Sequence, residues 1–314
     1  MQGNDIRITE KLRQRNILRA QCFAFGIPIR IIGQNAAGYT PESASTYVPA
    51  PAPSPNGYAP NGRVPAIQAE GLQKAYGQHW AVKNANLLVW PGEIVGFLGP
   101  NGAGKTTTIK MLTGLVKPSA GRAAISGYDI QAQPVQAKAT FGYVPDTPNL
   151  YGKLSGWEFL RFIARLYRVP TEQAERRANE LLRLFDLYEA ASDLTEGYSH
   201  GMQQKLALAG ALVHDPKVLF LDEPTVGLDP RSARLIKDML QQLRDRGTAV
   251  FFSTHILEIA ERMCDRVMII NNGEIIASGT MDELRGRGGT GSLEDIFLQL
   301  TGGAEYAAIA EVLR

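Results

Sequence analysis

Short apolar runs recur along the chain from Ile67 onward and predict the strands of a sheet. The clearest runs are Ile94–Leu98, Val218–Leu221, Ala249–Ser253 and Val267–Ile270. Helical patterns lie between them, and strands that alternate with helices are typical of a largely parallel sheet. We therefore expect a compact α/β fold over this part of the chain.

Two local signals set element boundaries within this fold. Asp229 followed by Pro230 predicts the start of a helix over Arg231–Arg246, and Gly247 is expected to end it. Aspartate caps helix N-termini, proline fits their first position, and glycine is common just after their last turn. The Asn-Gly pair at 272–273, between two apolar runs, predicts a two-residue hairpin turn.

A helical stretch over about Ser155–Glu189 interrupts the series of strands. Ser155 and Glu158 have the spacing of a capping box, in which each side chain accepts a hydrogen bond from the other residue's backbone N–H group. Apolar residues that share one face of the predicted helix are Leu160, Ile163, Ala164 and Tyr167. We expect an inserted α-helical subdomain at about 147–198.

The ends of the chain differ in composition from this domain. Residues 36–66 are rich in Ala, Pro, Ser and Gly without apolar periodicity, which is typical of an extended, largely disordered linker. Residues 1–35 form a basic tail, interpreted as dispensable or as the result of a start codon assigned too early, rather than as a targeting peptide. A C-terminal tail is expected at 302–314, after a domain that covers 67–301.

Composition excludes several classes of function. The formal net charge of the 314-residue chain is only +2, which gives no reason to expect a nucleic-acid partner. Its two cysteines, Cys22 and Cys264, lack metal-ligand spacing and fit a reducing compartment. No apolar run approaches the roughly 20 residues that cross a bilayer, so any membrane span must come from another chain.

A glycine-rich segment, GPNGAGKTT, follows the strand EIVGFL and opens a helix. In this context the pattern G-x-x-x-x-G-K-T predicts a phosphate-binding loop, although a structural glycine-rich turn is the alternative. Backbone N–H groups would surround the phosphates at the positive end of a helix dipole. Lys105 would reach the β- and γ-phosphates, and the Thr106 hydroxyl would ligate Mg²⁺. The predicted ATP-binding residues of this loop are Gly99, Pro100, Asn101, Gly102, Ala103, Gly104, Lys105, Thr106 and Thr107.

Candidate catalytic residues follow two other strands. Asp222 ends the apolar strand of KVLFLDEPT, where ligands collect in open α/β sheets, and is expected to hold Mg²⁺. Glu223 is expected to point to the opposite side, because strand side chains alternate, and so to face an attacking water. The alternative is a pair of solvated acids. His255 ends the next strand, FFSTH, where a neutral imidazole could contact the γ-phosphate and orient water.

These segments together resemble the ATPase subunit of ABC transporters. The resemblance runs from about Ile67 to Thr301, and five motifs occur in the family's order: GPNGAGKTT, YSHGM, Asp222-Glu223, Gly227-Leu228-Asp229 and His255. It implies an α/β P-loop NTPase (RecA-like) core with a mainly parallel sheet, an antiparallel β subdomain and an inserted helical subdomain. ATP and Mg²⁺ are the implied cofactors.

The resemblance implies that Ser199–Met202 acts in trans. Ser199, Gly201 and Met202 would grip the γ-phosphate of an ATP that a second ATPase subunit binds. The chain departs from the family pattern in two segments. In YSHGM, His200 replaces a glycine and Met202 replaces the glutamine; in FGYVPDTPNLYG, Asp146 stands where the family has its metal- and water-sensing glutamine. Phosphate contact should survive, and His200 either adds a contact or is a tolerated surface substitution. Whether Asp146 ligates Mg²⁺ is left open.

An aromatic residue ahead of the phosphate loop stacks on adenine in this family, and Tyr76 has that position in LQKAYGQHWAV. Core packing is the alternative role for Tyr76. Trp80 and Trp90 are interpreted as core residues.

The implied activity is Mg-dependent ATP hydrolysis in a head-to-tail dimer at the cytoplasmic face of a membrane. It would drive transport, in the exporter direction, through a separate transmembrane permease subunit. Glu223 would polarise water while Lys105 and His255 stabilise charge on the transferred phosphoryl group. A soluble ABC-type ATPase that is not coupled to transport is the main alternative, and a P-loop kinase is a weaker one.

Overall fold

The computed structural model describes residues 63–288, 293 and 296–297, and the described residues contain one ten-stranded sheet. The predictions for 1–35, 302–314 and most of 36–66 lie outside this part of the chain. In spatial order the strands are β5 (Tyr128–Asp129), β4 (Ala120–Ile125), β1 (Ile67–Tyr76), β2 (His79–Val89), β10 (Glu274–Gly279), β9 (Arg266–Asn271), β3 (Ile94–Leu98), β8 (Ala249–Thr254), β7 (Val218–Asp222) and β6 (Phe141–Val144).

One half of the sheet is parallel, as the apolar runs predict. Strands β9, β3, β8, β7 and β6 pair in parallel, and every residue of β3, β7 and β8 is buried. Asp222 is paired with Ser253 at the end of the β7–β8 ladder. The carboxyl ends of these strands therefore lie together at one edge of the sheet, which is where ligands bind in open α/β sheets.

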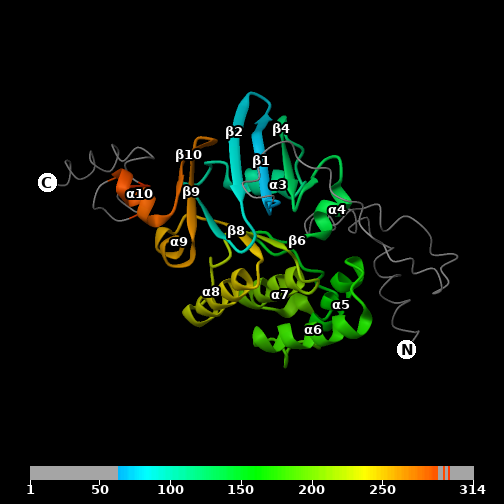
Figure 1. Ribbon diagram of the computed structural model, residues 1–314. Coiled ribbons are helices and arrows are strands. Elements are labelled where there is room, and N and C mark those ends of the chain that lie inside the picture. Colours follow the sequence, from blue (N-terminus) through cyan, green and yellow to red (C-terminus); the bar gives the residue numbers. More distant parts are fainter. Residues whose placement is uncertain (1–62, 289–292, 294–295, 298–314) are drawn as a thin grey trace.

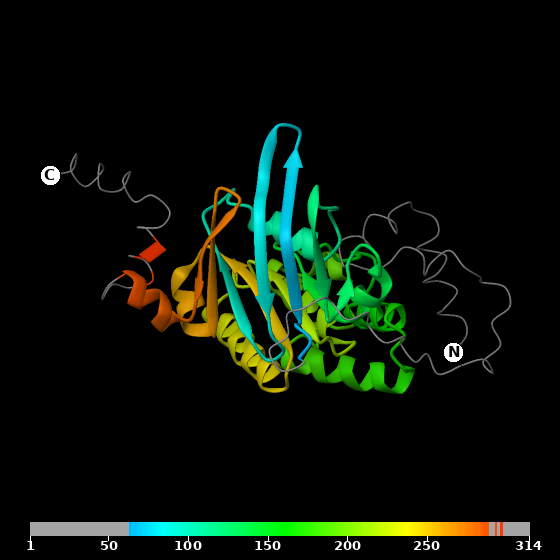
Figure 2. The same ribbon diagram turned by 45° about the horizontal axis from the view of Figure 1, so that its top comes forward.

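The other half is antiparallel and is joined to the first through a short parallel pairing of β2 with β10. Figure 2 shows the long hairpin of β1 and β2 rising from the body of the molecule. Strands β9 and β10 form the predicted hairpin. Its turn residues Asn272 and Gly273 have φ values of 47° and 79°, as an Asn-Gly turn with two left-handed residues requires.

Three helices pack together beside the sheet: α5 (Gly156–Leu166), α6 (Thr171–Leu184) and α7 (His200–Leu212) (Figure 1). The capping box before α5 is present, since Glu158 N–H donates to Ser155 Oγ at 3.2 Å and Ser155 N–H to Glu158 Oε2 at 2.9 Å. The predicted helical stretch contains two helices, α5 and α6. Arg168, with φ of 57°, and Pro170 separate them, because neither conformation continues an α-helix.

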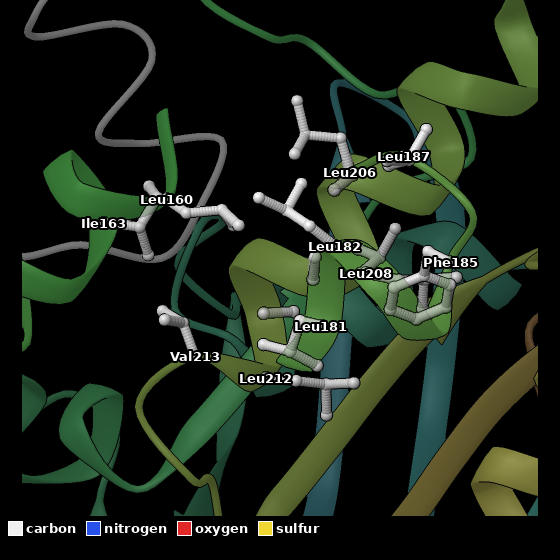
Figure 3. Close-up of a cluster of buried hydrophobic side chains, with 14 of the residues drawn as sticks. Leu160, Ile163, Leu181, Leu182, Phe185, Leu187, Leu206, Leu208, Leu212 and Val213 are labelled. Atoms are coloured by element: carbon white, nitrogen blue, oxygen red, sulfur yellow. The ribbon is translucent and has the colours of Figure 1, made fainter. Parts of the chain in front are cut away.

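Apolar side chains of α5, α6 and α7 meet in a common core (Figure 3). Labelled members are Leu160, Ile163, Leu181, Leu182, Phe185, Leu187, Leu206, Leu208, Leu212 and Val213. The same cluster includes Leu219 and Leu221 of β7, whereas Val218 and Phe220 belong to a second cluster. Alternate residues of one strand thus face two separate cores, as the pleat requires.

The second core holds α3 (Lys105–Leu112) on the opposite face of the sheet. The remaining described helices are α4 (Pro134–Ala139), α8 (Pro230–Asp245), α9 (Leu257–Met263) and α10 (Met281–Gly288). Asp229 caps α8 as predicted, since its Oδ1 accepts the Ser232 N–H at 3.0 Å. Among the described residues, no helix is both long and apolar enough to cross a membrane.

Candidate active site

The loop of residues 99–104 joins β3 to α3 and needs its glycines for space. A Cβ atom at Gly99 would lie 2.3 Å from the Ile270 carbonyl oxygen, and one at Gly104 would lie 2.5 Å from that of Ala81. Gly104 also has φ of 109°. Since only glycine fits such positions, the loop can follow β2 and β9 closely. Its backbone then leads directly into the N-terminus of α3, the arrangement that binds phosphate.

Lys105 is the first residue of α3 and is almost completely buried. Its Nζ donates to the carbonyl oxygens of Gly99 at 2.8 Å and Pro100 at 3.2 Å. The same atom lies 3.6 Å from Glu223 Oε1. The Lys105 ammonium group is therefore bound to carbonyl groups of its own loop and lies beside Glu223, the predicted base. Phosphate oxygens of ATP would have to replace these carbonyl groups.

Asp222 lies at the carboxyl end of β7 with one oxygen satisfied and one free. Ser253 Oγ donates to Oδ1, whereas Oδ2 is buried without a hydrogen-bond partner among the described residues. The pKa of this carboxyl group is raised, mainly by burial, and the neighbouring hydroxyl groups of Ser253 and Thr106 oppose the rise. An orphaned buried carboxylate oxygen beside a threonine hydroxyl suits a hard cation such as Mg²⁺, which takes oxygen ligands.

Glu223 corrects one expectation from the sequence. Its φ of 51° is left-handed, and β7 ends one residue earlier, so the alternation of strand side chains does not extend to it. Its backbone N–H donates to Ser253. The carboxylate lies between Lys105 and His255. A left-handed backbone at a non-glycine residue stores strain, which is common at functional sites.

His255 directly follows β8, as predicted, and its side chain is partly open to solvent. Its Nδ1 lies 3.0 Å from Glu223 Oε2. The parallel pairing of β7 with β8 brings these residues to the same edge of the sheet. The structure therefore joins Lys105, Glu223 and His255 in one group, with Asp222 and Thr106 beside it.

Asp146 lies in the exposed loop after β6. Its Oδ1 accepts the N–H of Thr147 at 2.8 Å, and its negative charge contributes to the raised pKa of Asp222. The carboxylates of Asp146 and Asp222 therefore interact electrostatically. A metal-ligating role for Asp146 stays a prediction.

The aromatic residues ahead of the loop lie at the end of the β1–β2 hairpin. Tyr76 is 51% exposed, with Lys74 Nζ 5.0 Å from its ring centre, so core packing does not explain it. The interpretation of Trp80 as a core residue is wrong, because this side chain is 47% exposed. Trp80 is paired with Ala75 near the tip of the hairpin, where none of the described helices covers the strands (Figure 2). Trp90 is partly buried.

The segment YSHGM begins α7 in the helical part of the molecule. Ser199 is the N-cap, and its Oγ accepts the Met202 N–H at 3.3 Å. Ser199, His200 and Gly201 are all accessible at this helix start. Helix α7 packs in the hydrophobic cluster on one face of β7, whereas α3, which follows the loop of residues 99–104, packs in the cluster on the other face. The sheet of one chain therefore lies between the two helices that the predicted phosphate-binding segments open.

Ser253 is a site residue that sequence reasoning missed. It is fully buried and contacts both the Asp222 side chain and the Glu223 backbone. The sequence signal that could have identified Ser253 is a polar residue near the end of an apolar strand, two positions before His255. Only the register of β8 beside β7 shows that it faces Asp222.

Comparison with known proteins agrees with this arrangement. Residues 82–226 match the family described as ABC transporter. The chain is 41% identical over 235 residues to the linearmycin resistance ATP-binding protein LnrL of Bacillus subtilis strain 168, covering 75% of this chain and 74% of that protein. It resembles a solved ATP-binding subunit of an ABC transporter with a TM-score of 0.72 and 35% identity, covering 75% of this chain and 99% of that chain.

A second solved structure is a dimeric ATP-binding cassette in a post-hydrolysis state, bound to ADP and Pi. Its TM-score is 0.63 at 27% identity, and the match covers 68% of this chain and 98% of that chain. These likenesses do not support the alternative of a P-loop kinase. With the phosphate loop, the two strand-end acids and the neighbouring histidine at one sheet edge, the chain belongs to the ABC transporter family as an ATP-binding subunit, and it is an ATPase.

Proposed function

We propose that two such subunits close head to tail around two ATP molecules. Each ATP would be held between residues 99–107 of one subunit and the Ser199 segment of the other. The observation that carries this is the exposed start of α7, where Ser199, Gly201 and Met202 lie away from the loop of their own chain. The free N–H groups of a helix N-terminus bind anions, so this surface suits a partner's γ-phosphate.

Within each site, Glu223 accepts the proton of the attacking water, and His255, whose Nδ1 lies 3.0 Å from Glu223 Oε2, contacts the γ-phosphate and orients that water. Lys105 exchanges the Gly99 and Pro100 carbonyl groups for phosphate oxygens and stabilises the charge that develops on them. Thr106, Asp222 and Asp146 are the residues that would hold Mg²⁺. When bound, Mg²⁺ neutralises phosphate charge. Tyr76 stacks on the adenine ring from the tip of the β1–β2 hairpin.

Hydrolysis would be coupled to a separate transmembrane permease subunit, with this chain peripheral at the cytoplasmic face of the membrane. The helical subdomain, next to Asp146 and the loop after β6, would transmit the opening and closing of the ATPase dimer to the permease subunit. Export is favoured, because the relative LnrL is named for resistance to an antibiotic. Nucleic acid is not an expected partner. The second ATPase subunit is either a copy of this chain or a related one.

Ser199→Arg tests the two-subunit site. The variant chain should still bind ATP, because its own phosphate loop is unchanged, but it should not form ATP-dependent dimers. Size-exclusion chromatography in a Glu223→Gln background, where hydrolysis is blocked, would measure this. Gln131→Arg, at an exposed residue of the turn before α4, provides a charge-matched control. ATP-dependent dimers of unchanged stability in the Ser199→Arg variant would contradict the proposal.

Coupling to transport needs a separate test. The full-length chain, tagged and expressed in its native host, should co-purify from detergent-solubilised membranes with an integral membrane protein, and Mg-ATP should change the yield. Recovery only from the soluble fraction would favour the alternative of a soluble ABC-type ATPase.

A further inference from the structure

The side chain of His200 lies against the turn that leads from Glu223 to helix α8. A Cβ atom placed on Gly227 would lie 3.1 Å from Cδ2 and 3.3 Å from Nε2 of the imidazole. Gly227 also has φ of 75°, so its backbone conformation and the space beside it both favour glycine. The imidazole ring of His200 therefore packs directly against the backbone of Gly227, which has no side chain.

A second contact joins the same two segments. A Cβ atom placed on Gly201 would lie 3.7 Å from Leu228 Cδ2, an ordinary van der Waals distance. Leu228 and Met202 also pack against the same hydrophobic cluster. The first turn of α7 and residues 226–228 thus form one packed unit, and His200 is its outer, exposed part.

The turn is hydrogen-bonded back to the predicted base. Val226 N–H donates to the Glu223 carbonyl oxygen at 3.3 Å, and Leu228 N–H to that of Thr225 at 3.4 Å. At its other end, Asp229 is fixed as the cap of α8. A displacement of Gly227 would therefore be passed to the backbone of Glu223, which already has a left-handed conformation.

We propose that His200 is a positioning residue. Its imidazole holds residues 226–228 against the start of α7, and through them it holds Glu223. The inference rests on the proposed two-subunit site, in which the start of α7 faces the partner's ATP. His200 would then link engagement of the partner's phosphate to placement of the chain's own base. Because Cδ2 and Nε2 both lie beside Gly227, the ring has a packing role toward the turn rather than a contact with phosphate.

The first test separates packing from a polar contact. His200→Gly, which restores the glycine usual in this family, removes the ring. We expect kcat to fall by about tenfold, since small misplacements of reacting groups are costly, with little change in KM for ATP. His200→Phe keeps a flat ring of similar size and should restore most of kcat. The melting temperatures of both variants should stay close to that of the unchanged chain.

Several outcomes would overturn the inference. Unchanged kcat in His200→Gly would show that the contact with Gly227 has no role in hydrolysis. If His200→Phe were as impaired as His200→Gly, or if KM rose instead, the imidazole would act through a polar contact with nucleotide.

A double-mutant cycle tests the contact itself. Gly227→Ala should lower kcat, because its Cβ would displace the ring, and this effect should be smaller when His200→Gly is already present. Gly247→Ala is the matched control for backbone strain, since Gly247 has φ of 93° and an added Cβ there would have no neighbour within 4 Å. Additive effects of the two substitutions would overturn the inference.

Failure of the proposed function gives a different result. His200→Gly should still form ATP-dependent dimers in the Glu223→Gln background, whereas Ser199→Arg should not. Dimers that survive Ser199→Arg would contradict the two-subunit site, whatever the His200 variants do. A normal Ser199→Arg result with additive His200 and Gly227 effects would reject the positioning role alone.

Discussion

Nδ1 of His255 lies 3.0 Å from Oε2 of Glu223, and on the other side of the same carboxylate Nζ of Lys105 lies 3.6 Å from Oε1. Glu223 is therefore flanked by two nitrogen groups that come from different strand–helix units. The carboxylate is only slightly accessible to solvent. The carboxylate therefore lies within ion-pair distance of both groups before ATP binds, and Lys105 must move away from it to reach phosphate.

Glu223→Gln should nearly stop hydrolysis while ATP binding persists. Glutamine keeps the size and one oxygen of the side chain but cannot accept a proton from water, a loss of about 10²–10⁴ in rate. The variant should accumulate as an ATP-bound dimer, measured by size exclusion with Mg-ATP and by phosphate release. Glu258→Gln on the exposed face of α9 is the control and should hydrolyse ATP normally. Near-normal turnover of Glu223→Gln would refute the assignment of the base.

Lys105→Ala should weaken ATP binding by about 10- to 100-fold, because hydrogen bonds to charged groups are worth roughly 1.5–3 kcal/mol each. Titration calorimetry without turnover would measure the dissociation constant. Lys110→Ala, on the same helix but outside the loop, is the matched control. Loss of hydrolysis at unchanged ATP affinity would contradict the role of Lys105 as a phosphate anchor.

His214 should make stability depend on pH. Its ring stacks on Tyr167 with centroids 3.5 Å apart, and its Nε2 lies 3.1 Å from the Phe141 carbonyl oxygen. The His214 pKa is lowered from 6.5 to about 4, mainly by burial and in smaller part by the charge of Arg177, while the hydrogen bond to the Phe141 carbonyl group and the charge of Asp215 oppose the shift. The folded state therefore favours the neutral ring. This contribution is complete above pH 6.5 and is lost as pH falls from 6.5 to about 4.

The loss should be on the order of 3 kcal/mol of unfolding free energy. Melting temperatures at a series of pH values would show it as a steeper acid decline in the natural chain than in His214→Phe. That variant keeps a ring for the stack on Tyr167 but cannot be protonated. Parallel curves for the two proteins would contradict the prediction.

Gly142→Ala should destabilise the protein at the contact between β6 of the sheet and α7 of the helical subdomain. A Cβ atom at Gly142 would lie 2.3 Å from the Ala211 carbonyl oxygen, so β6 and α7 would have to separate. Overpacking of this kind typically costs about 1–3 kcal/mol. Chemical denaturation would measure it. Gly197→Ala, with no neighbour within 4 Å, should be neutral. Equal stability of the two variants would count against the close approach.

A chain that starts at Arg63 should keep its ATPase rate and melting temperature. The Pro/Ala/Ser-rich composition of residues 36–66 provides too little apolar surface to pack as a folded unit. Comparison of the truncated and full-length chains by phosphate release and calorimetry would test this. A large loss of either property would show that residues 1–62 support the domain.

The sequence determined the features that depend on neighbours along the chain. The phosphate loop, the capping box at Ser155, the cap at Asp229 and the Asn272-Gly273 hairpin are each encoded within a few residues. Backbone conformation and hydrogen bonding at that range follow from residue type alone. The apolar runs also predicted the parallel strands, because a strand that faces two cores has few polar positions.

Only the tertiary structure decided features that depend on residues far apart in sequence. The direction of the Glu223 carboxylate follows from its left-handed backbone and from Lys105 and His255, not from strand alternation. Trp80 is exposed because, within the described part of the chain, no helix covers the tip of its hairpin, and the side chain's own apolar character could not reveal this. The contact of His200 with Gly227 arises because helix packing places the start of α7 beside a turn whose missing Cβ leaves room for a ring.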